Sequence, residues 1–243
     1  MLKNLFNGRA RAPDGVRLYA IGDIHGCAEL LDRLMALIAK EEAAATAHLQ
    51  LVFLGDYLDR GPDSLGVLDR LIAVRKARPD SIFLKGNHEA GFLDFLKSPA
   101  DFAEWLHWGG AETLESYGVE RPWARPVEDL AADIAERLPP SHLAFLQGLE
   151  LFRVFGDYLF VHAGVRPGVP LEAQEERDLL WIRGEFHHAP PEARPDKVVV
   201  HGHQPTRNPV DAGWRIGVDT GACFNGRLTA VVLEGETRRF VST

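Results

Sequence analysis

Six short apolar runs, each ending in Gly, Asp, His or Asn, constrain this sequence more than any other feature. The runs and their polar ends are Val16–Ile21 before Asp23 and His25, Leu49–Leu54 before Asp56, Ser81–Leu84 before Asn87 and His88, Tyr158–Val161 before His162, Lys197–Val200 before His203, and Trp214–Val218 before Asp219. Short runs rich in Val, Ile, Leu and Phe and bounded by Gly are typical of buried β-strands. We therefore expect a sheet whose strands end in side chains able to bind a ligand.

Helical patterns lie between several of these runs. Residues 27–40 and 64–78 each place leucines and isoleucines on one stripe, and Pro62 suits the start of the second helix. The alternation of strands and helices predicts an α/β fold. Because polar residues at the carboxyl ends of neighbouring strands converge where such folds bind ligands, the Asp and His side chains are expected to face one cleft.

Residues 90–150 have a different pattern, because their helical segments are broken by Gly109, Gly110 and several prolines. We interpret this stretch as a helical insertion into a single domain formed by residues 1–243. Its aromatic residues are expected to form a small core of their own or, as an alternative, one wall of the cleft: Trp105, Trp108 and Tyr117.

Composition narrows the classes of partner. The formal net charge of −8 argues against nucleic-acid binding through overall basic charge and against attraction to anionic lipid. No apolar run approaches the roughly 18 residues of a membrane span. Residues 1–11 lack the apolar centre of a signal peptide, and two cysteines cannot form a disulfide framework. The expected location is therefore the cytoplasm, with no membrane or nucleic-acid partner.

The polar strand ends have the chemistry of a metal site. Imidazole and carboxylate ligands without thiolate suit Mn, Fe or Zn and exclude a structural zinc site of the Cys type. Seven such groups exceed the needs of one ion, and a carboxylate has two oxygens with which to bridge two ions. Two cations about 3.5–4 Å apart can hold the attacking and leaving oxygens of a displacement at phosphorus. The residues therefore predict a dinuclear centre.

Three segments carry a more specific resemblance: GDIHG at residues 22–26, GDYLDRG at residues 55–61 and GNHE at residues 86–89. They closely resemble the GDxHG, GDxVDRG and GNHE blocks of the metal-dependent phosphoprotein phosphatases. These are the PPP-type serine/threonine phosphatases of the calcineurin-like metallophosphoesterase superfamily. The segments HAG at 162–164 and GH at 202–203 match later blocks, and the compact chain is similar to the bacterial and phage members.

This resemblance covers about residues 19–233 and implies a fold, a cofactor and a set of ligands. The implied fold is a calcineurin-like four-layer α/β/β/α sandwich, in which mixed β-sheets pack with helices and a dinuclear metal site lies at the strand carboxyl ends. The implied cofactor is two divalent ions, Mn²⁺ foremost with Fe or Zn as alternatives, whose bridging hydroxide attacks phosphorus in line. The implied metal ligands are Asp23, His25, Asp56 (shared by both ions), Asn87, His162 and His203.

The resemblance also implies roles for residues that touch the substrate. His88 is the expected general acid for the leaving group, and Asp59 is expected to hold its imidazole. Arg183 lies in a Trp-x-Arg segment similar to one that supplies a second phosphate-binding arginine in bacterial and phage members. For Lys85, phosphate contact and a surface position are equal alternatives. The expected phosphate-binding residues are thus Arg60, Arg183, Asn87 and Lys85.

The remaining histidines are expected to have structural roles. His201 has no counterpart in the family and is expected to pack or form a hydrogen bond beside its strand end. Surface or helix-capping positions are expected for His48, His107, His142, His187 and His188.

The expected activity is metal-dependent phosphomonoester hydrolysis on phosphoserine or phosphothreonine in a protein or peptide. The alternative is hydrolysis of diadenosine tetraphosphate, which makes the substrate a nucleotide. Relatives with that activity typically carry Asp in place of Glu89 and lack a counterpart of Asp59, so the sequence favours the phosphatase. A metal-binding module without turnover is disfavoured, because every implied ligand is present together with Arg60 and His88.

Overall fold

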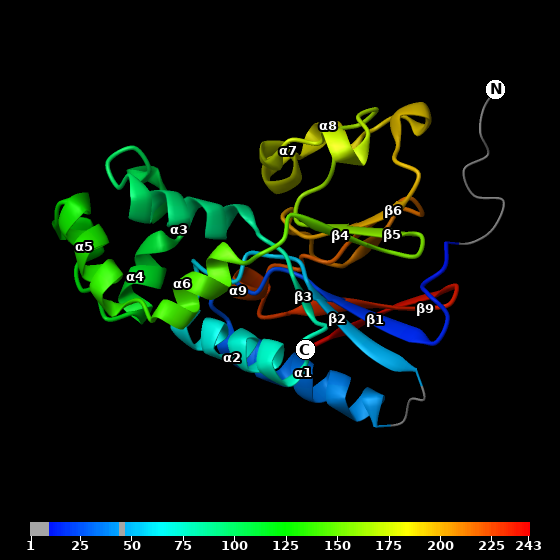
Figure 1. The fold of residues 1–243 in the computed structure, drawn as a ribbon, viewed down its shortest axis with the longest axis horizontal. Coiled ribbons are helices and arrows are strands. Elements are labelled where there is room, and N and C mark those ends of the chain that lie inside the picture. The colour runs from blue at the N-terminus through cyan, green and yellow to red at the C-terminus, as the bar shows by residue number, and fades with distance from the viewer. Residues whose placement is uncertain (1–9, 44–46) are drawn as a thin grey trace.

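The computed structural model describes residues 10–43 and 47–243, whose strands form two five-stranded mixed sheets (Figure 1). Residues 1–9, where most of a signal peptide was sought, lie outside the described residues. The first sheet has the order β10 (Thr237–Ser242), β9 (Thr229–Glu234), β1 (Val16–Ile21), β2 (His48–Phe53) and β3 (Ile82–Phe83). The second has the order β4 (Phe152–Phe155), β5 (Tyr158–Val161), β6 (Val198–His201), β8 (Arg215–Gly217) and β7 (Val210–Asp211).

The central strands of each sheet are parallel. β1 pairs in parallel with β2 and β2 with β3, while β6 pairs in parallel with both β5 and β8. The carboxyl ends of parallel neighbours lie at the same edge of a sheet. The loops that carry the predicted ligands therefore leave each sheet at one edge.

The two faces of the first sheet belong to two different hydrophobic cores, because side chains alternate along each strand. Leu18 and Ala20 of β1 face Phe160 and Val200 of the second sheet, in a fully buried layer between the two sheets. The intervening Tyr19 and its alternate neighbours belong to a second cluster, on the face that the helices cover. Side chains of a strand point alternately to the two faces, so both faces of the first sheet are buried.

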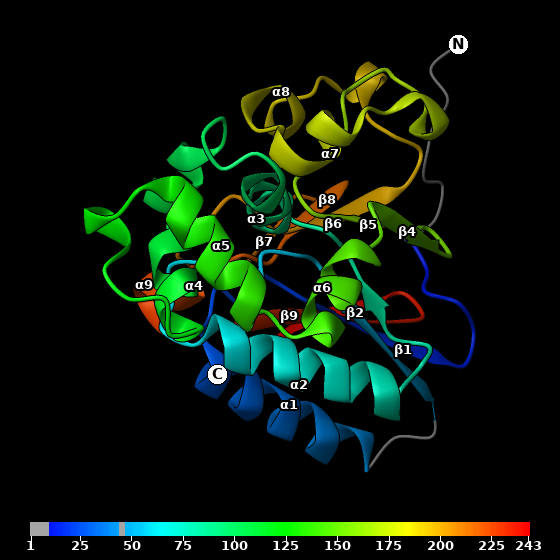
Figure 2. The same ribbon diagram turned by 60° about the vertical axis from the view of Figure 1, so that its left-hand side comes forward.

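Helices complete the sandwich on both sides (Figures 1 and 2). α1 (Ala28–Glu42) and α2 (Ser64–Ala77) lie side by side against the first sheet, and α7 (Glu176–Trp181) and α8 (Gly184–His187) cover the second. The fold expected from the sequence, two mixed sheets packed with helices, is confirmed. Three further short helices are η3 (Leu171–Ala173), η4 (Pro191–Ala193) and α9 (Ala222–Asn225).

The helical insertion lies at one end of the molecule, drawn in green in Figure 1. Its helices are α3 (Asn87–Lys97), η1 (Ala103–Trp108), α4 (Gly110–Ser116), η2 (Pro122–Ala124), α5 (Val127–Arg137) and α6 (Pro140–Gln147). Leu114, Ile134 and Trp105 share one hydrophobic cluster with Leu68 of α2. The separate small core expected for the insertion is therefore wrong, because its residues extend the main core. This continuity supports the single domain, which stays a prediction.

Candidate dinuclear metal centre

Loops after β1, β2, β5 and β6, together with the start of α3, bring the predicted ligands to one place. All six side chains are buried, with at most 5 % of their surface exposed: Asp23, His25, Asp56, Asn87, His162 and His203.

Among the described residues, no helix has both the length and the apolar character to cross a membrane.

Backbone strain marks the same loops. Among the described residues other than glycine, a positive φ occurs at Arg121 and at five residues of these loops: His25, Asp56, Asp59, Arg60 and His203. Residues with a side chain in this region cost about 1–3 kcal/mol each, and such strain clusters at functional sites. The loops are therefore held by contacts that outweigh the local preference of the chain.

Glu89 provides such contacts for the loop that carries Asp56. Its Oε2 atom accepts hydrogen bonds from the backbone N–H groups of Asp56 and Gly86, both at 2.8 Å. Its Oε1 atom accepts from Tyr57 at 2.7 Å and Leu58 at 3.2 Å. A side chain at Gly86 has no room, because its Cβ atom would lie 2.1 Å from Oδ1 of Asp56. No pattern in the sequence predicts this structural role of Glu89.

Three ligand-type atoms converge on one point. Oδ1 of Asn87 lies 3.0 Å from Nε2 of His162 and 2.9 Å from Nδ1 of His203, and the two imidazole nitrogens are 3.2 Å apart. Oδ1 of Asp56 lies 3.4 Å from Nε2 of His162. Ligands held about 2.1 Å from one ion at right angles are separated by about 3.0 Å. The spacing therefore fits four ligands around one cation.

Hydrogen bonds on the far side of two imidazoles turn the lone pair of each ring towards the centre. Nδ1 of His162 lies 2.8 Å from the carbonyl oxygen of Leu54, and Nδ1 of His25 lies 2.8 Å from that of Leu58. A carbonyl can only accept, so in the neutral rings the proton is on Nδ1 and Nε2 carries a lone pair. The Nε2 lone pair of His162 faces the oxygens of Asn87 and Asp56, an arrangement that a cation relieves.

The second carboxylate oxygen of Asp56 faces a different cluster. Its Oδ2 atom lies 3.5 Å from Nε2 of His25 and 3.8 Å from Nε2 of His88. Asp56 thus belongs to two groups of closely spaced ligand atoms, one with His25 and His88 and one with His162 and His203. A carboxylate that presents one oxygen to each of two groups is placed to bridge two ions.

Asp23 lies beside these groups but is not a member of either. Both of its oxygens accept the backbone N–H of His203, at 3.0 and 3.2 Å. Burial, followed by the charges of Asp219 and Asp56, raises the pKa of Asp23 well above its usual value. Its role as a metal ligand stays a prediction, and a cation nearby offsets the crowding of three buried carboxyl groups.

Burial also keeps the imidazoles of the centre neutral. It lowers the pKa of His25 to about 3 and that of His203 to about 2. A neutral imidazole has the lone pair that a metal ion needs. The centre is therefore ready to bind a cation at neutral pH without releasing protons from these two rings.

His88 and Asp59, which were expected to pair, are in contact. Nδ1 of His88 lies 2.7 Å from Oδ2 of Asp59. Asp59 also accepts hydrogen bonds from Nε1 of Trp105 at 2.8 Å and from the hydroxyl of Thr113 at 2.6 Å. The insertion therefore helps to fix this carboxylate, a role that sequence reasoning missed because the contacts cross about fifty residues.

Two of the three expected basic residues lie at the centre. Nη1 of Arg60 lies 2.7 Å from Nε2 of His25, and Nη2 lies 2.9 Å from Nε2 of His88. Nε of Arg183 lies 3.1 Å from Nε2 of His203. The two guanidinium groups thus contact the histidines of different clusters.

Lys85 points elsewhere. Its Nζ atom forms an ion pair with Glu176 of α7 at 3.0 Å. This contact favours the structural alternative for Lys85, and its proposed phosphate contact has no support from the geometry.

His142 contradicts the expectation of a surface or capping position. Its side chain is buried, with Nδ1 2.7 Å from the hydroxyl of Tyr117 and Nε2 3.0 Å from Asp69 of α2. It therefore connects the insertion to α2.

The imidazole of His201 packs against the ring of Phe186, with the ring centres 5.2 Å apart. It lies beside its own strand end, as expected. Exposed positions are confirmed for His48, His107 and His188.

Aromatic side chains form one wall beside both clusters. The ring of Trp108 lies 6.4 Å from His88 and 5.1 Å from Trp181, and the ring of Trp181 lies 6.3 Å from His203. The alternative expectation, that aromatic residues of the insertion line the cleft, is met by Trp108. Trp181 is the tryptophan of the Trp-x-Arg segment that contains Arg183, but no pattern in the sequence places its ring at the site.

Comparison with known proteins places the chain in a family. The family model described as calcineurin-like phosphoesterase matches residues 16–233. Two curated relatives are asymmetrical bis(5′-nucleosyl)-tetraphosphatases PrpE. That of Anoxybacillus flavithermus is 25 % identical over 87 % of this chain and 88 % of the relative. That of Bacillus subtilis is 27 % identical over 86 % and 87 %.

A solved structure agrees over nearly the whole fold. It is a crystal structure provisionally assigned as a diadenosine tetraphosphatase, with a TM-score of 0.66 and 23 % identity. The match covers 96 % of this chain and 98 % of that one. Since the family match spans most of the sequence, the chain belongs to the calcineurin-like phosphoesterase family.

Proposed function

We propose that this chain is a metal-dependent hydrolase of dinucleoside tetraphosphates. The hydrolytic chemistry is supported above all by Asp56, whose two oxygens face two separate groups of ligand atoms. The nucleotide substrate is supported by relatives of 25–27 % identity that are named as bis(5′-nucleosyl)-tetraphosphatases. These relatives give more weight to the nucleotide than to the phosphoprotein that the sequence favoured.

The ligand set suits two divalent cations, of which we propose Mn²⁺ with Fe or Zn as alternatives. When bound, such cations supply Lewis-acid activation of water and of the phosphoryl group. The residues that would hold them are Asp23, His25 and Asp56 for one ion, and Asp56, Asn87, His162 and His203 for the other.

Arg60 and Arg183 are placed to bind different phosphates of one substrate. Each guanidinium group lies against a histidine of a different cluster. One guanidinium group can donate two parallel hydrogen bonds to the oxygens of a phosphate, and a tetraphosphate has anionic oxygens along its length. Two arginines that contact different clusters can therefore hold neighbouring phosphates and fix the one that is attacked.

His88 is placed to give a proton to the leaving oxygen. Burial alone lowers the pKa of His88, but the charges of Asp56 and Asp59 outweigh it, so the pKa is raised above its ordinary value. Nδ1 is engaged by Asp59, which leaves Nε2 towards the centre. In this structure Nε2 lies 2.9 Å from Nη2 of Arg60, a group that only donates, so Nε2 accepts there. Once a phosphate takes over the guanidinium group, the imidazolium form has its transferable proton on the side where the substrate binds.

A phosphoprotein phosphatase is the second candidate, and the His88–Asp59 pair favours it. An alkoxide released from phosphoserine is a strong base and requires a proton, whereas a polyphosphate leaves as a weak base. An acid held as firmly as His88 is more useful to the first reaction than to the second.

A side-by-side assay separates the two candidates. The purified full chain, loaded with Mn²⁺, is given diadenosine tetraphosphate and a phosphoserine peptide under the same conditions. We expect kcat/KM for the dinucleotide to exceed that for the peptide by at least about tenfold, since only the dinucleotide occupies both arginines. Faster cleavage of the peptide would overturn the proposal in favour of the phosphatase. Asp56→Asn should abolish both activities and serves as the control for a contaminating enzyme.

A further inference from the structure

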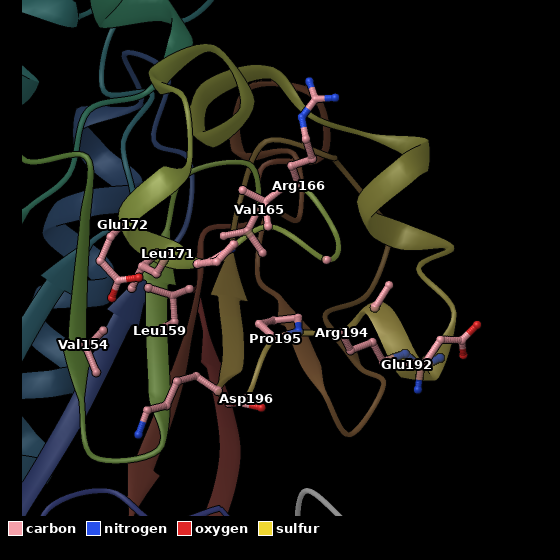
Figure 3. Close-up of a pocket in the computed structure, with 15 residues that line it drawn as sticks. Val154, Leu159, Val165, Arg166, Leu171, Glu172, Glu192, Arg194, Pro195 and Asp196 are labelled. Carbon is pink, nitrogen blue, oxygen red and sulfur yellow. The ribbon is translucent and has the colours of Figure 1, made fainter. Parts of the chain in front are cut away.

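Two cavities are candidates for binding part of the substrate. The larger, of about 560 Å³, lies on the outer face of the second sheet (Figure 3). Its floor is formed by Leu159 and Leu171, and Arg166 at its rim is paired with Asp178 at 2.6 Å. None of the predicted site residues lines it. The second cavity, of about 390 Å³, shares Arg60 and Trp108 with the metal centre.

We propose that this second cavity binds a nucleobase of the substrate. We call it the aromatic pocket, and its side chains that matter here are Arg60, His107, Trp108, Glu112, Trp123 and Phe224. The inference rests on the proposed nucleotide substrate and deepens it, because it names where a base lies and which phosphate is attacked.

The exposure of its two largest side chains is the first argument. Phe224 and Trp123 have 66 % and 60 % of their surface exposed, the highest values among the large apolar residues described. They come from α9 and η2, which lie far apart in the sequence, and they line one cavity. Exposed aromatic groups that gather around a hollow mark a binding site for an apolar or aromatic ligand.

The link to the metal centre is the second argument. The guanidinium carbon of Arg60 lies 5.6 Å from the ring centre of Phe224. The two Nη atoms of the same guanidinium group contact His25 and His88. One side chain thus joins the phosphate position to an aromatic surface. A ligand with a phosphate and a flat ring one short link apart matches this arrangement.

The chemistry of the walls favours a base over other rings. The ring of His107 lies 4.8 Å from that of Trp123, which extends the stacking surface. Glu112 adds an exposed carboxylate, which accepts hydrogen bonds from an exocyclic amino group such as that of adenine. A volume of 390 Å³ is within the range of small-molecule sites, and a phosphoserine side chain has no group to fill it.

This placement selects the phosphorus that is attacked. A base on Phe224 and a phosphate at Arg60 are separated by one ribose, so the phosphate at the metal centre is the α-phosphate of the same nucleoside. The water oxygen bonds to that phosphorus, and the bond from phosphorus to the bridging oxygen breaks. The bridging oxygen leaves with the electron pair as part of ATP, and the protons of water pass to product oxygens or to solvent. The products are AMP and ATP, and the new oxygen is in AMP.

Substitution of the exposed rings tests the pocket. For the Mn²⁺-loaded double variant Trp123→Ala/Phe224→Ala, we expect kcat/KM on diadenosine tetraphosphate to fall by about 5- to 100-fold, the range for lost base stacking. The kcat/KM for tripolyphosphate, which has no base, should stay within about twofold of the unaltered chain. Trp123→Phe/Phe224→Tyr should retain most of the activity on the dinucleotide. Phe102→Ala, an exposed ring outside the pocket, is the matched control.

The outcomes separate this inference from the proposed function. If the unaltered chain cleaves only phosphopeptides, both proposals fail. If it cleaves the dinucleotide and the double Ala variant is equally fast, the nucleobase site fails and the proposed function stands. Loss of activity on a phosphotyrosine peptide alone would identify a peptide ring as the occupant and overturn the inference. In ¹⁸O-labelled water, label in AMP supports the placement, whereas label in ATP or formation of ADP contradicts it.

Discussion

The Nδ1 atom of His88 lies 2.7 Å from Oδ2 of Asp59, and both side chains are buried. Trp105 and Thr113 donate to the same carboxylate, so Asp59 is held from two further sides. An imidazole fixed at Nδ1 in this way keeps its orientation when the substrate binds. The fold therefore positions His88 before the substrate binds. The contribution of His88 to the rate of hydrolysis depends on how strongly the leaving group requires a proton.

His88→Ala should slow different substrates by very different factors. We expect kcat for a phosphoserine peptide to fall by about 100- to 10,000-fold, the usual range for loss of a general acid. For diadenosine tetraphosphate the loss should be no more than about tenfold, because the released triphosphate is a weak base. The measurement is kcat on both substrates at equal metal content.

His48→Ala is the control for loss of a histidine, because His48 is exposed and paired with Asp80 at the surface. It should leave both rates unchanged. Equal losses on the two substrates in His88→Ala would show that His88 acts on metal or substrate binding, and that the acid assignment is wrong.

Asp56→Asn should remove metal and activity together. The amide keeps the size of the side chain but loses the charge that faces both ligand groups. Loss of a residue that only forms a hydrogen bond to a metal ligand lowers metal affinity or activity by about 10- to 100-fold. Loss of a ligand shared by both ions should therefore lower metal affinity and activity by at least about 100-fold. Atomic emission of the purified variant should show less than half of the metal in the unaltered chain.

Asp80→Asn, a surface substitution, provides the comparison for Asp56→Asn and should keep full metal content. Metal-stripped protein supplied with Mn²⁺, Fe²⁺ or Zn²⁺ in turn then ranks the ions by restored activity. Retention of two ions per chain in Asp56→Asn would contradict the shared-ligand assignment.

The strands that carry the site could be located from the sequence. The six apolar runs match β1, β2, β3, β5, β6 and β8 within one residue at each end, because buried parallel strands read as continuous apolar segments. β4, β7 and β10 were missed, because polar residues interrupt the apolar ones in these partly exposed edge strands. β9 has an apolar centre but is not followed by an Asp, His or Asn at its end, so it did not share the pattern.

The side chains of the site were less predictable than its strands. Motif blocks placed Asp56, His162 and His203 together, since each block follows a strand. The contacts of Trp105 and Trp108 depend on how the insertion folds back on the sheet, and no local pattern encodes that packing. Phe224 lay in a short helix after Asp219 and had no signal until the fold brought α9 to η2.

Glu89→Gln should destabilise the chain although Glu89 touches neither the expected ions nor the substrate. Its two oxygens accept four backbone N–H groups. In glutamine one oxygen becomes an NH₂ group that faces two of these donors, and each buried donor left without a partner costs about 1–3 kcal/mol. We expect Tm to fall by at least about 4 °C.

Glu89→Asp is the matched variant, because it keeps both oxygens and shortens the side chain by one methylene. It should lose less stability than Glu89→Gln, as measured by thermal unfolding of both proteins with metal removed. Equal stability of Glu89→Gln and the unaltered chain would mean that the loop of Asp56 is held by other contacts.

His187 should make stability depend on mildly acidic pH. Its ring packs against both Phe186 and His201, and burial, followed by the charge of Arg215, lowers its pKa to about 4. In the unfolded chain the pKa of a histidine is about 6.5. Between about pH 4 and about pH 6.5 the unfolded chain therefore binds more protons than the folded chain. The contribution of the neutral His187 to the free energy of unfolding is therefore complete above about pH 6.5. It is lost progressively as the pH falls towards 4.

His187→Gln should weaken that dependence. Because the side chain is only partly buried and solvent screens its charge, we expect an effect of about 1 kcal/mol, or about 2–4 °C in Tm. Tm is measured from pH 7.5 to pH 4 for both proteins with a chelator present, so that the other histidines contribute equally and cancel in the difference. His188→Gln, an exposed neighbour, should follow the unaltered chain. Parallel curves for His187→Gln and the unaltered chain would show that the imidazole stays solvated in the folded protein.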